Sequence, residues 1–118
     1  TRGINEMFEI AKYYNANPKT FMGLSGLGDI IVTCTSKHSR NRYVGEELGK
    51  GRKIDDIISS MKMVSEGAET IKALYAIIKE NNIQAPIMSA LYEVIYENRP
   101  VNELVSLFMN RNLRSEFI

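Results

Sequence analysis

Apolar residues recur at intervals of three and four along most of this 118-residue chain, and this spacing predicts a helical protein. The pattern is clearest from residue 65 to residue 82, where one apolar stripe follows a single helical face. The stripe consists of Ala68, Ile71, Leu74, Tyr75 and Ile78. Pro86 and Pro100 are each expected to open a further helix, because proline is tolerated in a first helical turn. The residues expected to point inward on these two helices are Ile87, Ala90, Leu91, Val94, Ile95, Val101, Leu104, Val105 and Phe108.

The first half predicts shorter helices. The opening stretch "TRGINEMFEIAKYYN" is helical in pattern from its first residues and begins without Met, so we expect the chain to be part of a longer protein. Asn17 and Pro18 are a plausible cap and first-turn residue for the next helix. The face expected to be apolar on the opening helix consists of Ile4, Met7, Phe8, Ala11 and Tyr14.

Residues 19–34 are expected to form short helical turns separated by glycines, with "DIIVTC" as a buried helix, since no partner strands lie nearby. Ser39 is placed to cap a helix that runs through "RNRYVGEELGKG" and ends at Gly49 and Gly51. "KIDDIISSMKM" predicts one more short helix. The fold class expected is therefore all-α, a compact bundle of about six to seven helices that forms one domain over residues 1–118.

The composition of the chain argues against several classes of protein. The net charge of +1 argues against a dedicated nucleic-acid binder or a membrane-surface binder, because such domains usually carry a basic excess. A single cysteine forms no internal disulfide, no run approaches the ~20 apolar residues of a membrane span, and no signal peptide is visible. These features suit a cytoplasmic protein.

The stretch "GLSGLGDIIVTCTSKHSRNR", residues 23–42, concentrates the chemistry of the chain. Ser39, Arg40 and Asn41 fall at an expected helix start, where free N–H groups and a guanidinium suit a phosphorylated ligand. The alternative for these residues is a solvated first turn. Asp29 is expected to be partly buried, and it serves either to orient a lysine or bind a hydroxyl, or as a cap or ion-pair partner.

The other reactive side chains of this stretch indicate a function less clearly. Thr33 either bonds the preceding helical turn or faces a site. Cys34 has no catalytic partner at a telling spacing and is expected to be a small buried residue, and His38 is expected to be exposed, with no cluster of metal ligands around it. Further along, Val64 and Glu66 belong to a glycine-containing loop or helix start. There Glu66 is either an acid stabilised by the helix dipole or an acceptor of hydrogen bonds from a ribose or an amide.

The stretch "GLSGLGDIIVTCTSKHSRNRYVGEELGKG" closely resembles the C-terminal domain signature of the bacterial NAD(P)-dependent glycerol-3-phosphate dehydrogenases. "MVSEGAETIKALY" and "QAPIMSALYEVIYENRPVNELVSLFMNR" are similar to later parts of the same family, so the resemblance covers nearly the whole chain. It implies an enzyme with a Rossmann domain for NAD or NADP and an all-helical substrate domain. The reaction implied interconverts dihydroxyacetone phosphate and sn-glycerol 3-phosphate, which supplies phospholipid synthesis.

The resemblance also implies roles for individual residues. Asp29 would line the site beside a catalytic lysine and the substrate hydroxyls, as a supporting catalytic and substrate-binding group. The other substrate-binding residues implied are Thr33, Ser39, Arg40 and Asn41, and the cofactor-binding residues implied are Arg40, Val64 and Glu66. No metal site is implied, and a homodimer is the expected assembly.

The chain departs from the family pattern in lacking a G-x-G-x-x-G fingerprint and a match for the catalytic lysine, since neither Lys12 nor Lys19 fits that motif. We therefore expect the Rossmann domain and the lysine to precede Thr1, and the 118 residues alone to be inactive. One rival interpretation is a stand-alone helical binding module for nucleic acid or a protein partner, with cations at Lys37, Arg40, Arg42 and Arg52. The other is a different two-domain dehydrogenase, such as one acting on sugar acids.

Overall fold

A computed structural model of the chain describes residues 1–63 and 65–110. Within these ranges the protein is entirely helical, which confirms the predicted fold class. It consists of α1 (Arg2–Lys12), α2 (Pro18–Met22), the π-helical turn η1 (Leu24–Gly28), α3 (Asp29–Thr35), α4 (Arg40–Gly49), α5 (Ile54–Ser60), α6 (Glu66–Glu80), α7 (Pro86–Tyr96) and α8 (Val101–Met109).

The segment from α2 to α3 contains three short elements, and this division raises the number of helices above the six or seven expected. Gly26 explains part of the geometry, because a Cβ built there would lie 2.2 Å from the carbonyl oxygen of Phe21. Only glycine lets η1 approach the end of α2 so closely. Asp29 then begins α3 directly after the turn.

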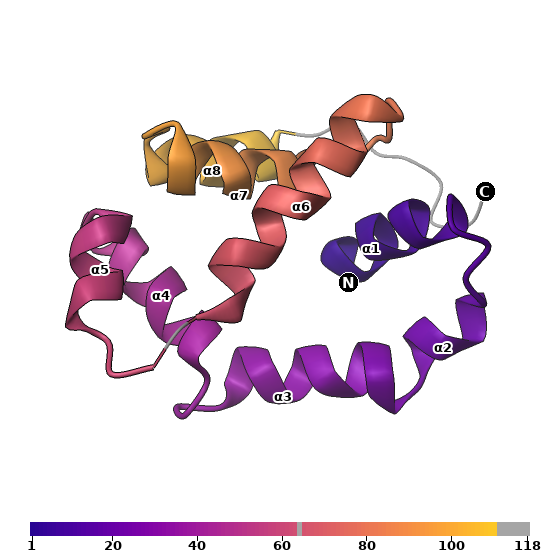
Figure 1. The fold of residues 1–118 in the computed structure, drawn as a ribbon, viewed down its shortest axis with the longest axis horizontal. Coiled ribbons are helices and arrows are strands. Elements are labelled where there is room, and N and C mark those ends of the chain that lie inside the picture. The colour runs from indigo at the N-terminus through magenta and orange to yellow at the C-terminus, as the bar shows by residue number, and fades with distance from the viewer. Residues whose placement is uncertain (64, 111–118) are drawn as a thin grey trace.

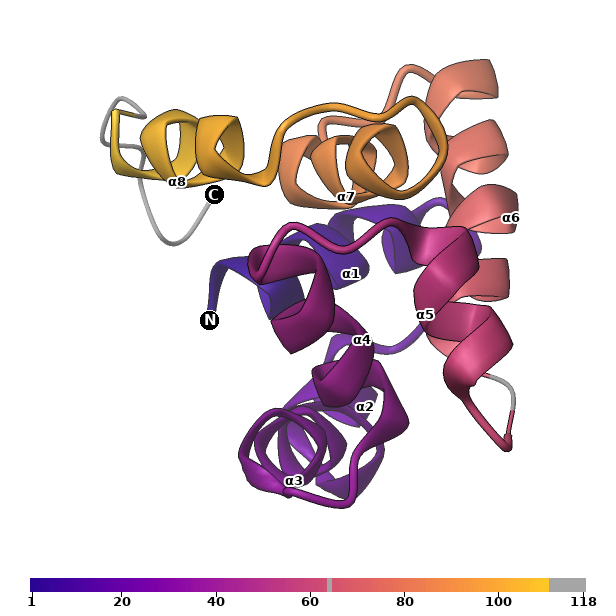
Figure 2. The same cartoon turned by 90° about the vertical axis from the view of Figure 1, so that its left-hand side faces the viewer.

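Helix α6 runs from the side of the molecule that holds α7 to the start of α4 (Figure 1). It packs against α7, which also contacts α1 and α8, while its first turn lies near the start of α4. The view in Figure 2 shows α2 and α3 at the end opposite α7 and α8. Helix α4 contacts α3, α5, α6 and α8, so the beginning of α4 is the point where the elements of the first half meet the second half.

Two apolar clusters form the core. The larger one is built around Val44, Leu48, Ile57, Ile71, Val94 and Ile95, and the smaller one around Ile10, Ile78 and Ala85. The predicted stripe on α6 is confirmed, since Ala68, Ile71 and Ile78 are buried and Leu74 and Tyr75 are half-buried. Ile57 is fully buried and fixes α5 against α4.

Several predicted positions are more exposed than expected. Helix α3 contains no buried residue, and Val32 is 64% exposed, so the prediction of a buried helix at "DIIVTC" was wrong. Among the described elements α3 packs mainly on η1 and α4, which leaves its other side in solvent. Tyr14 lies beyond the end of α1 and is 58% exposed, and Leu91 and Val105 are also exposed.

Polar side chains reinforce these helix contacts. Glu6 is 5% exposed, and its carboxylate accepts hydrogen bonds from the backbone N–H groups of Ile87 and Met88 at the start of α7. Glu47 accepts hydrogen bonds from Lys50 and Arg52, and these cations lower the pKa of its carboxyl group. Arg52 also donates to the carbonyl oxygen of Asp56, which ties α4 to α5.

The end of α4 follows the sequence prediction. Gly51 has a φ of 89°, its N–H donates to the carbonyl oxygen of Leu48, and the Arg52 N–H donates to that of Glu47. These two bonds form a Schellman motif, in which glycine takes the left-handed position. No helix within residues 1–63 and 65–110 has the length and apolar character needed to cross a membrane.

Candidate functional site

Helix α4 begins with a side-chain cap, as predicted. The hydroxyl oxygen of Ser39 accepts a hydrogen bond of 3.1 Å from the backbone N–H of Arg42, which is the third residue of the helix. This arrangement satisfies one of the free donors of the first turn and leaves the positive end of the helix dipole at Ser39 and Arg40. The start of α4 is therefore a fixed position that favours negative charge.

The two arginines of this turn differ in their partners. Arg42 donates to the carbonyl oxygen of Thr35, the last residue of α3, over 2.8 Å, and it also pairs with Glu46. Arg40 makes no hydrogen bond or ion pair with the residues that the structure describes. Its guanidinium therefore keeps all five donors for a ligand. Arg42 holds the two helices together, whereas Arg40 is the exposed cation of the turn.

Asn41 connects the start of α4 to the start of α6. Its Oδ1 atom accepts hydrogen bonds from the hydroxyl group of Ser65, at 2.9 Å, and from the backbone N–H of Gly67, at 3.3 Å. Ser65 is 4% exposed whereas Asn41 is exposed, so this contact lies at the boundary between the interior and the surface. The amide thus brings Glu66, the first residue of α6, close to the start of α4.

These helix ends enclose a hollow of about 420 Å³, which we call the α3–α4 hollow. Its lining residues are Asp29, Val32, Thr33, Ser36, His38, Ser39, Arg40, Asn41 and Glu66. The set contains six of the seven side chains that the sequence selected for substrate or cofactor contact. Arg40 supplies a positive charge there, while Asp29 and Glu66 supply carboxylates. The hollow therefore presents groups suited to a phosphate and groups suited to hydroxyls within one concavity.

The environment of Asp29 differs from the prediction. Asp29 is exposed, so the expected partial burial was wrong. Thr33, one turn further along the same helix, is half-buried and lines the same hollow. Cys34 is also exposed, which contradicts its expected burial, while the exposure of His38 is as predicted.

Glu66 and Val64 were selected together by the sequence, and the structure describes only one of them. Glu66 is exposed at the first position of α6 and lines the α3–α4 hollow. Val64 lies outside the described residues. Its position at the start of α6 is compatible with stabilisation of the carboxylate by the helix dipole, and Glu66 also lines the hollow.

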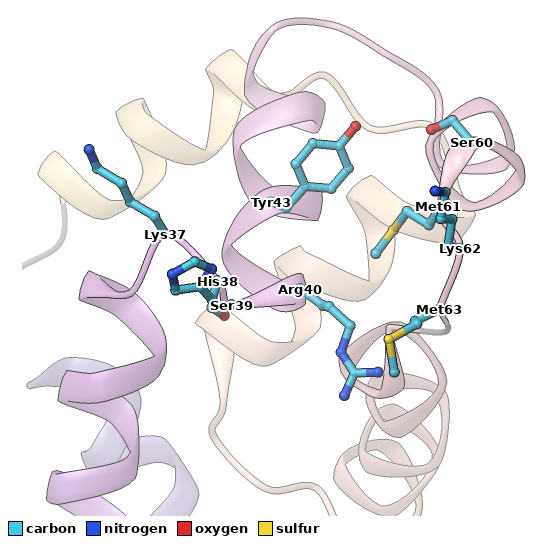
Figure 3. Close-up of a pocket in the computed structure, with 9 residues that line it drawn as sticks. All are labelled: Lys37, His38, Ser39, Arg40, Tyr43, Ser60, Met61, Lys62 and Met63. Atoms are coloured by element: carbon cyan, nitrogen blue, oxygen red, sulfur yellow. The ribbon is translucent and has the colours of Figure 1, made fainter.

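A second hollow of about 340 Å³ adjoins the first, and we call it the α4–α5 hollow. It is lined by Lys37, His38, Ser39, Arg40, Tyr43, Ser60, Met61, Lys62 and Met63. Figure 3 shows the side chain of Arg40 extending toward Met63, whereas Lys37 extends away from it. Arg40 lines both hollows.

Sequence reasoning did not assign a role to two residues that shape the site. Ser65 donates a hydrogen bond to Asn41, which lies 24 positions earlier. A serine next to a helix start is expected to cap its own helix, so nothing in the neighbouring sequence predicts this distant contact. Ser36 accepts a hydrogen bond from the backbone N–H of His38 and shapes the turn before α4. In the described residues, no group of three or more His, Cys, Asp or Glu side chains is placed to hold a metal ion.

Comparison with known proteins identifies relatives along the whole chain. Residues 1–106 match the family described as "NAD-dependent glycerol-3-phosphate dehydrogenase C-terminus". A "Glycerol-3-phosphate dehydrogenase [NAD(P)+]" from Chlorobium phaeobacteroides is 47% identical over 116 residues, which are 98% of this chain. Proteins with the same description from Staphylococcus saprophyticus and Levilactobacillus brevis are each 48% identical, over 98% and 99% of this chain. The chain spans 35% of the length of each of these relatives.

Proposed function

Because this chain belongs to the NAD-dependent glycerol-3-phosphate dehydrogenase C-terminus family, we propose that its α3–α4 hollow binds sn-glycerol 3-phosphate and dihydroxyacetone phosphate. The observation that carries the proposal is the gathering of six predicted site residues around this one hollow. They come from α3, from the start of α4 and from the start of α6. The starts of α4 and α6 suit a small anionic ligand, because free N–H groups and the positive end of a helix dipole favour negative charge there.

The phosphate group of the substrate is assigned to the start of α4. Arg40 has no partner among the described residues, so it can form two parallel hydrogen bonds with phosphate oxygens without breaking an internal contact. Ser39 and Asn41 lie on either side of it in the sequence and line the same hollow. Since the phosphate does not react, its binding energy serves to position the reacting carbon.

The hydroxyl groups of the substrate are assigned to the α3 side of the hollow. Asp29 and Thr33 are four residues apart on α3, so they share a face of the helix, and both line the hollow. A carboxylate accepts hydrogen bonds from hydroxyl groups, and a threonine hydroxyl both donates and accepts. This division places the charged end of the ligand at Arg40 and its polyol end near Asp29.

The residues present also fit part of a nicotinamide cofactor. Glu66 lines the hollow, and its carboxylate has no hydrogen-bond or ion-pair partner among the described residues, so it can accept hydrogen bonds from a ribose or a carboxamide; Arg40 lies within the same lining. Bound NAD(H) or NADP(H) supplies the hydride that reduces the ketone. The residues of this chain that line the hollow orient the substrate. We keep Val64 as a proposed cofactor contact on the basis of sequence resemblance.

Reduction of a ketone develops negative charge on the carbonyl oxygen, and a lysine ammonium group is suited to stabilise that charge and donate a proton. Among the described residues no lysine lines the α3–α4 hollow. We therefore assign the general acid, together with the dinucleotide fingerprint, to the part of a complete enzyme that these 118 residues do not include. Asp29 supports the reaction by facing the substrate hydroxyls.

The proposal extends to the whole enzyme. These 118 residues form a substrate-binding domain within a longer cytoplasmic oxidoreductase that supplies glycerol 3-phosphate for phospholipid synthesis. A homodimer is the proposed assembly, and no nucleic acid is involved. Two of the four cations proposed for nucleic-acid binding also argue against that alternative, because they form ion pairs within the protein: Arg42 with Glu46 and Arg52 with Glu47.

Kinetics of the complete enzyme test this function. We expect NADH- or NADPH-dependent reduction of dihydroxyacetone phosphate, no comparable turnover of sugar acids, and no turnover by the 118 residues alone. Replacing Arg40 with Gln removes charge-assisted hydrogen bonds, each contributing about 1.5–3 kcal/mol, so KM for the phosphorylated substrate should rise at least tenfold. An unchanged KM in R40Q, or turnover by the 118 residues alone, would contradict the proposal.

A further inference from the structure

Ser65 and Gly67, together with Asn41, form a contact for which the proposed function does not yet account. Both residues donate hydrogen bonds to the same atom, Oδ1 of Asn41. From this arrangement we infer that Ser65 and Gly67 are positioning residues, which orient the Asn41 amide toward the substrate phosphate. The inference rests on the proposed function, since it assigns a role at the same hollow.

The hydrogen bonds at the start of α6 are unusual in their direction. Ser65 occupies the N-cap position, yet its hydroxyl makes no capping bond to α6. The N–H of Gly67, the second residue of the helix, instead donates to Asn41 on α4. Asn41 thus caps α6 from another helix, while the Ser65 hydroxyl, freed from its usual local role, donates to Asn41.

These two donors determine how the amide is turned. A backbone N–H can only donate, so the atom of Asn41 that faces Gly67 must be the oxygen. The Nδ2 group then lies on the other side of the amide and has no acceptor among the residues described. Asn41 and Arg40 both line the α3–α4 hollow, so Nδ2 is available as a neutral donor in the hollow that Arg40 also lines.

Gly67 also sets the distance between the two helices. A Cβ built on Gly67 would lie 2.7 Å from Oδ1 and 2.9 Å from Cγ of Asn41, which is closer than real Cβ atoms approach. Any larger side chain must therefore displace the amide. Elsewhere Gly45, on α4, has nothing within 4 Å of its built Cβ, so alanine fits there without moving a neighbour.

Steady-state kinetics of the complete enzyme separate a positioning role from a purely structural one. In S65A and G67A, the lost orientation of Nδ2 should weaken substrate phosphate binding. A neutral hydrogen bond contributes about 0.5–1.5 kcal/mol, so we expect KM for dihydroxyacetone phosphate to rise roughly three- to tenfold, with a smaller change in kcat. S65T keeps a hydroxyl group and should recover most of the loss. KM for the nicotinamide cofactor provides an internal comparison.

Two matched variants control for helix effects. G45A adds the same methyl group to a helix without touching Asn41, and T70A removes a hydroxyl from α6 that bonds only its own helix, at the Glu66 carbonyl oxygen. Both should keep the unmodified KM. If S65A and G67A also keep it, the positioning role is wrong, even when their melting temperatures fall.

A direct measurement of the amide distinguishes failure of this inference from failure of the proposed function. In nuclear magnetic resonance spectra, the Asn41 side-chain NH₂ signals should shift in S65A and G67A and stay in place in G45A. Unmoved signals in both variants would overturn the positioning role. If they shift as expected but the unmodified complete enzyme does not reduce dihydroxyacetone phosphate, the contact is established and the proposed function fails instead.

Discussion

Glu6 on α1 accepts two hydrogen bonds from the backbone N–H of Ile87, with lengths of 2.9 and 2.8 Å to its two carboxylate oxygens. The two residues are 81 positions apart in the sequence. The carboxylate takes the place of a local cap at α7, whose own N-cap residue is Ala85 and provides no side-chain oxygen. One buried acid therefore joins the first helix to the seventh.

Removing this cap should destabilise the fold. Glu6→Ala leaves the N–H groups of the half-buried residues Ile87 and Met88 without this acceptor, and we expect the free energy of unfolding to fall by about 1–3 kcal/mol. Chemical denaturation measures the change. Glu9→Ala is the matched control, because it removes an exposed acid of the same helix that pairs with Lys12, and its effect should stay below about 1 kcal/mol. Equal effects of the two substitutions would contradict the cap.

The arginines of the α4 turn should divide into one structural and one functional residue. Arg42→Ala removes the bond to the Thr35 carbonyl oxygen and should lower the free energy of unfolding by about 0.5–1.5 kcal/mol. Arg40→Ala breaks no internal contact of the described residues, so its melting temperature should match that of the unmodified protein. Calorimetry on both variants checks the division, and a large loss of stability in R40A would contradict it.

The ionisation of Glu47 should make stability depend on pH. Hydrogen bonds from Lys50 and Arg52 hold the pKa of Glu47 below its ordinary value in the folded state. The folded protein thus favours the charged form, and the resulting stabilisation is complete above the unfolded-state pKa of about 4.3 and disappears as the pH falls through the lower folded-state pKa.

Glu47→Gln tests this linkage. The difference in unfolding free energy between the unmodified protein and E47Q should be constant near neutral pH and shrink below about pH 4.3. Denaturation curves at a series of pH values measure it. Glu80→Gln makes the same substitution at an exposed glutamate that has no ion pair in the described part of the chain, and it controls for the change of residue type. A pH-independent difference for E47Q would contradict the linkage.

Gly26 should tolerate no side chain. Gly26→Ala would bring its Cβ against the backbone of Phe21, which cannot move as a side-chain tip can, so we expect a loss of about 1–3 kcal/mol in unfolding free energy. Gly49→Ala provides the contrast, because its built Cβ meets nothing within 4 Å and alanine favours a helix by about 1 kcal/mol. In thermal denaturation, the melting temperature of G26A should lie below that of the unmodified protein, and the melting temperature of G49A should lie above it.

Local chemistry explains which parts of the structure were predictable. The Ser39 cap, the Gly51 helix end and the α6 stripe each depend on residues within a few positions of one another, and all three are confirmed. Glu6 was missed because its partners lie on α7, and a glutamate inside an apolar helix pattern gives no sign of a distant cap.

The candidate site shows the same division. The family resemblance implied seven contact residues, and six of them line one hollow, whereas residue types and spacing alone left a structural alternative open for most of them. The exposure of Asp29 was predicted incorrectly, because burial depends on which elements cover α3, and nothing in its neighbouring residues specifies that. Ser65 was missed for a related reason, since its hydroxyl reaches another helix instead of its own.

The side chains of the four residues 39–42 are directed to four different places, and three of them make hydrogen bonds. Ser39 bonds its own helix, Arg40 faces solvent, Asn41 reaches α6 and Arg42 reaches α3. Successive residues of an α-helix project about 100° apart, so each direction belongs to one position only. Inserting or deleting a single residue here would rotate every one of these side chains onto the wrong neighbour. The order of this tetrapeptide is therefore under a stricter geometric constraint than its composition.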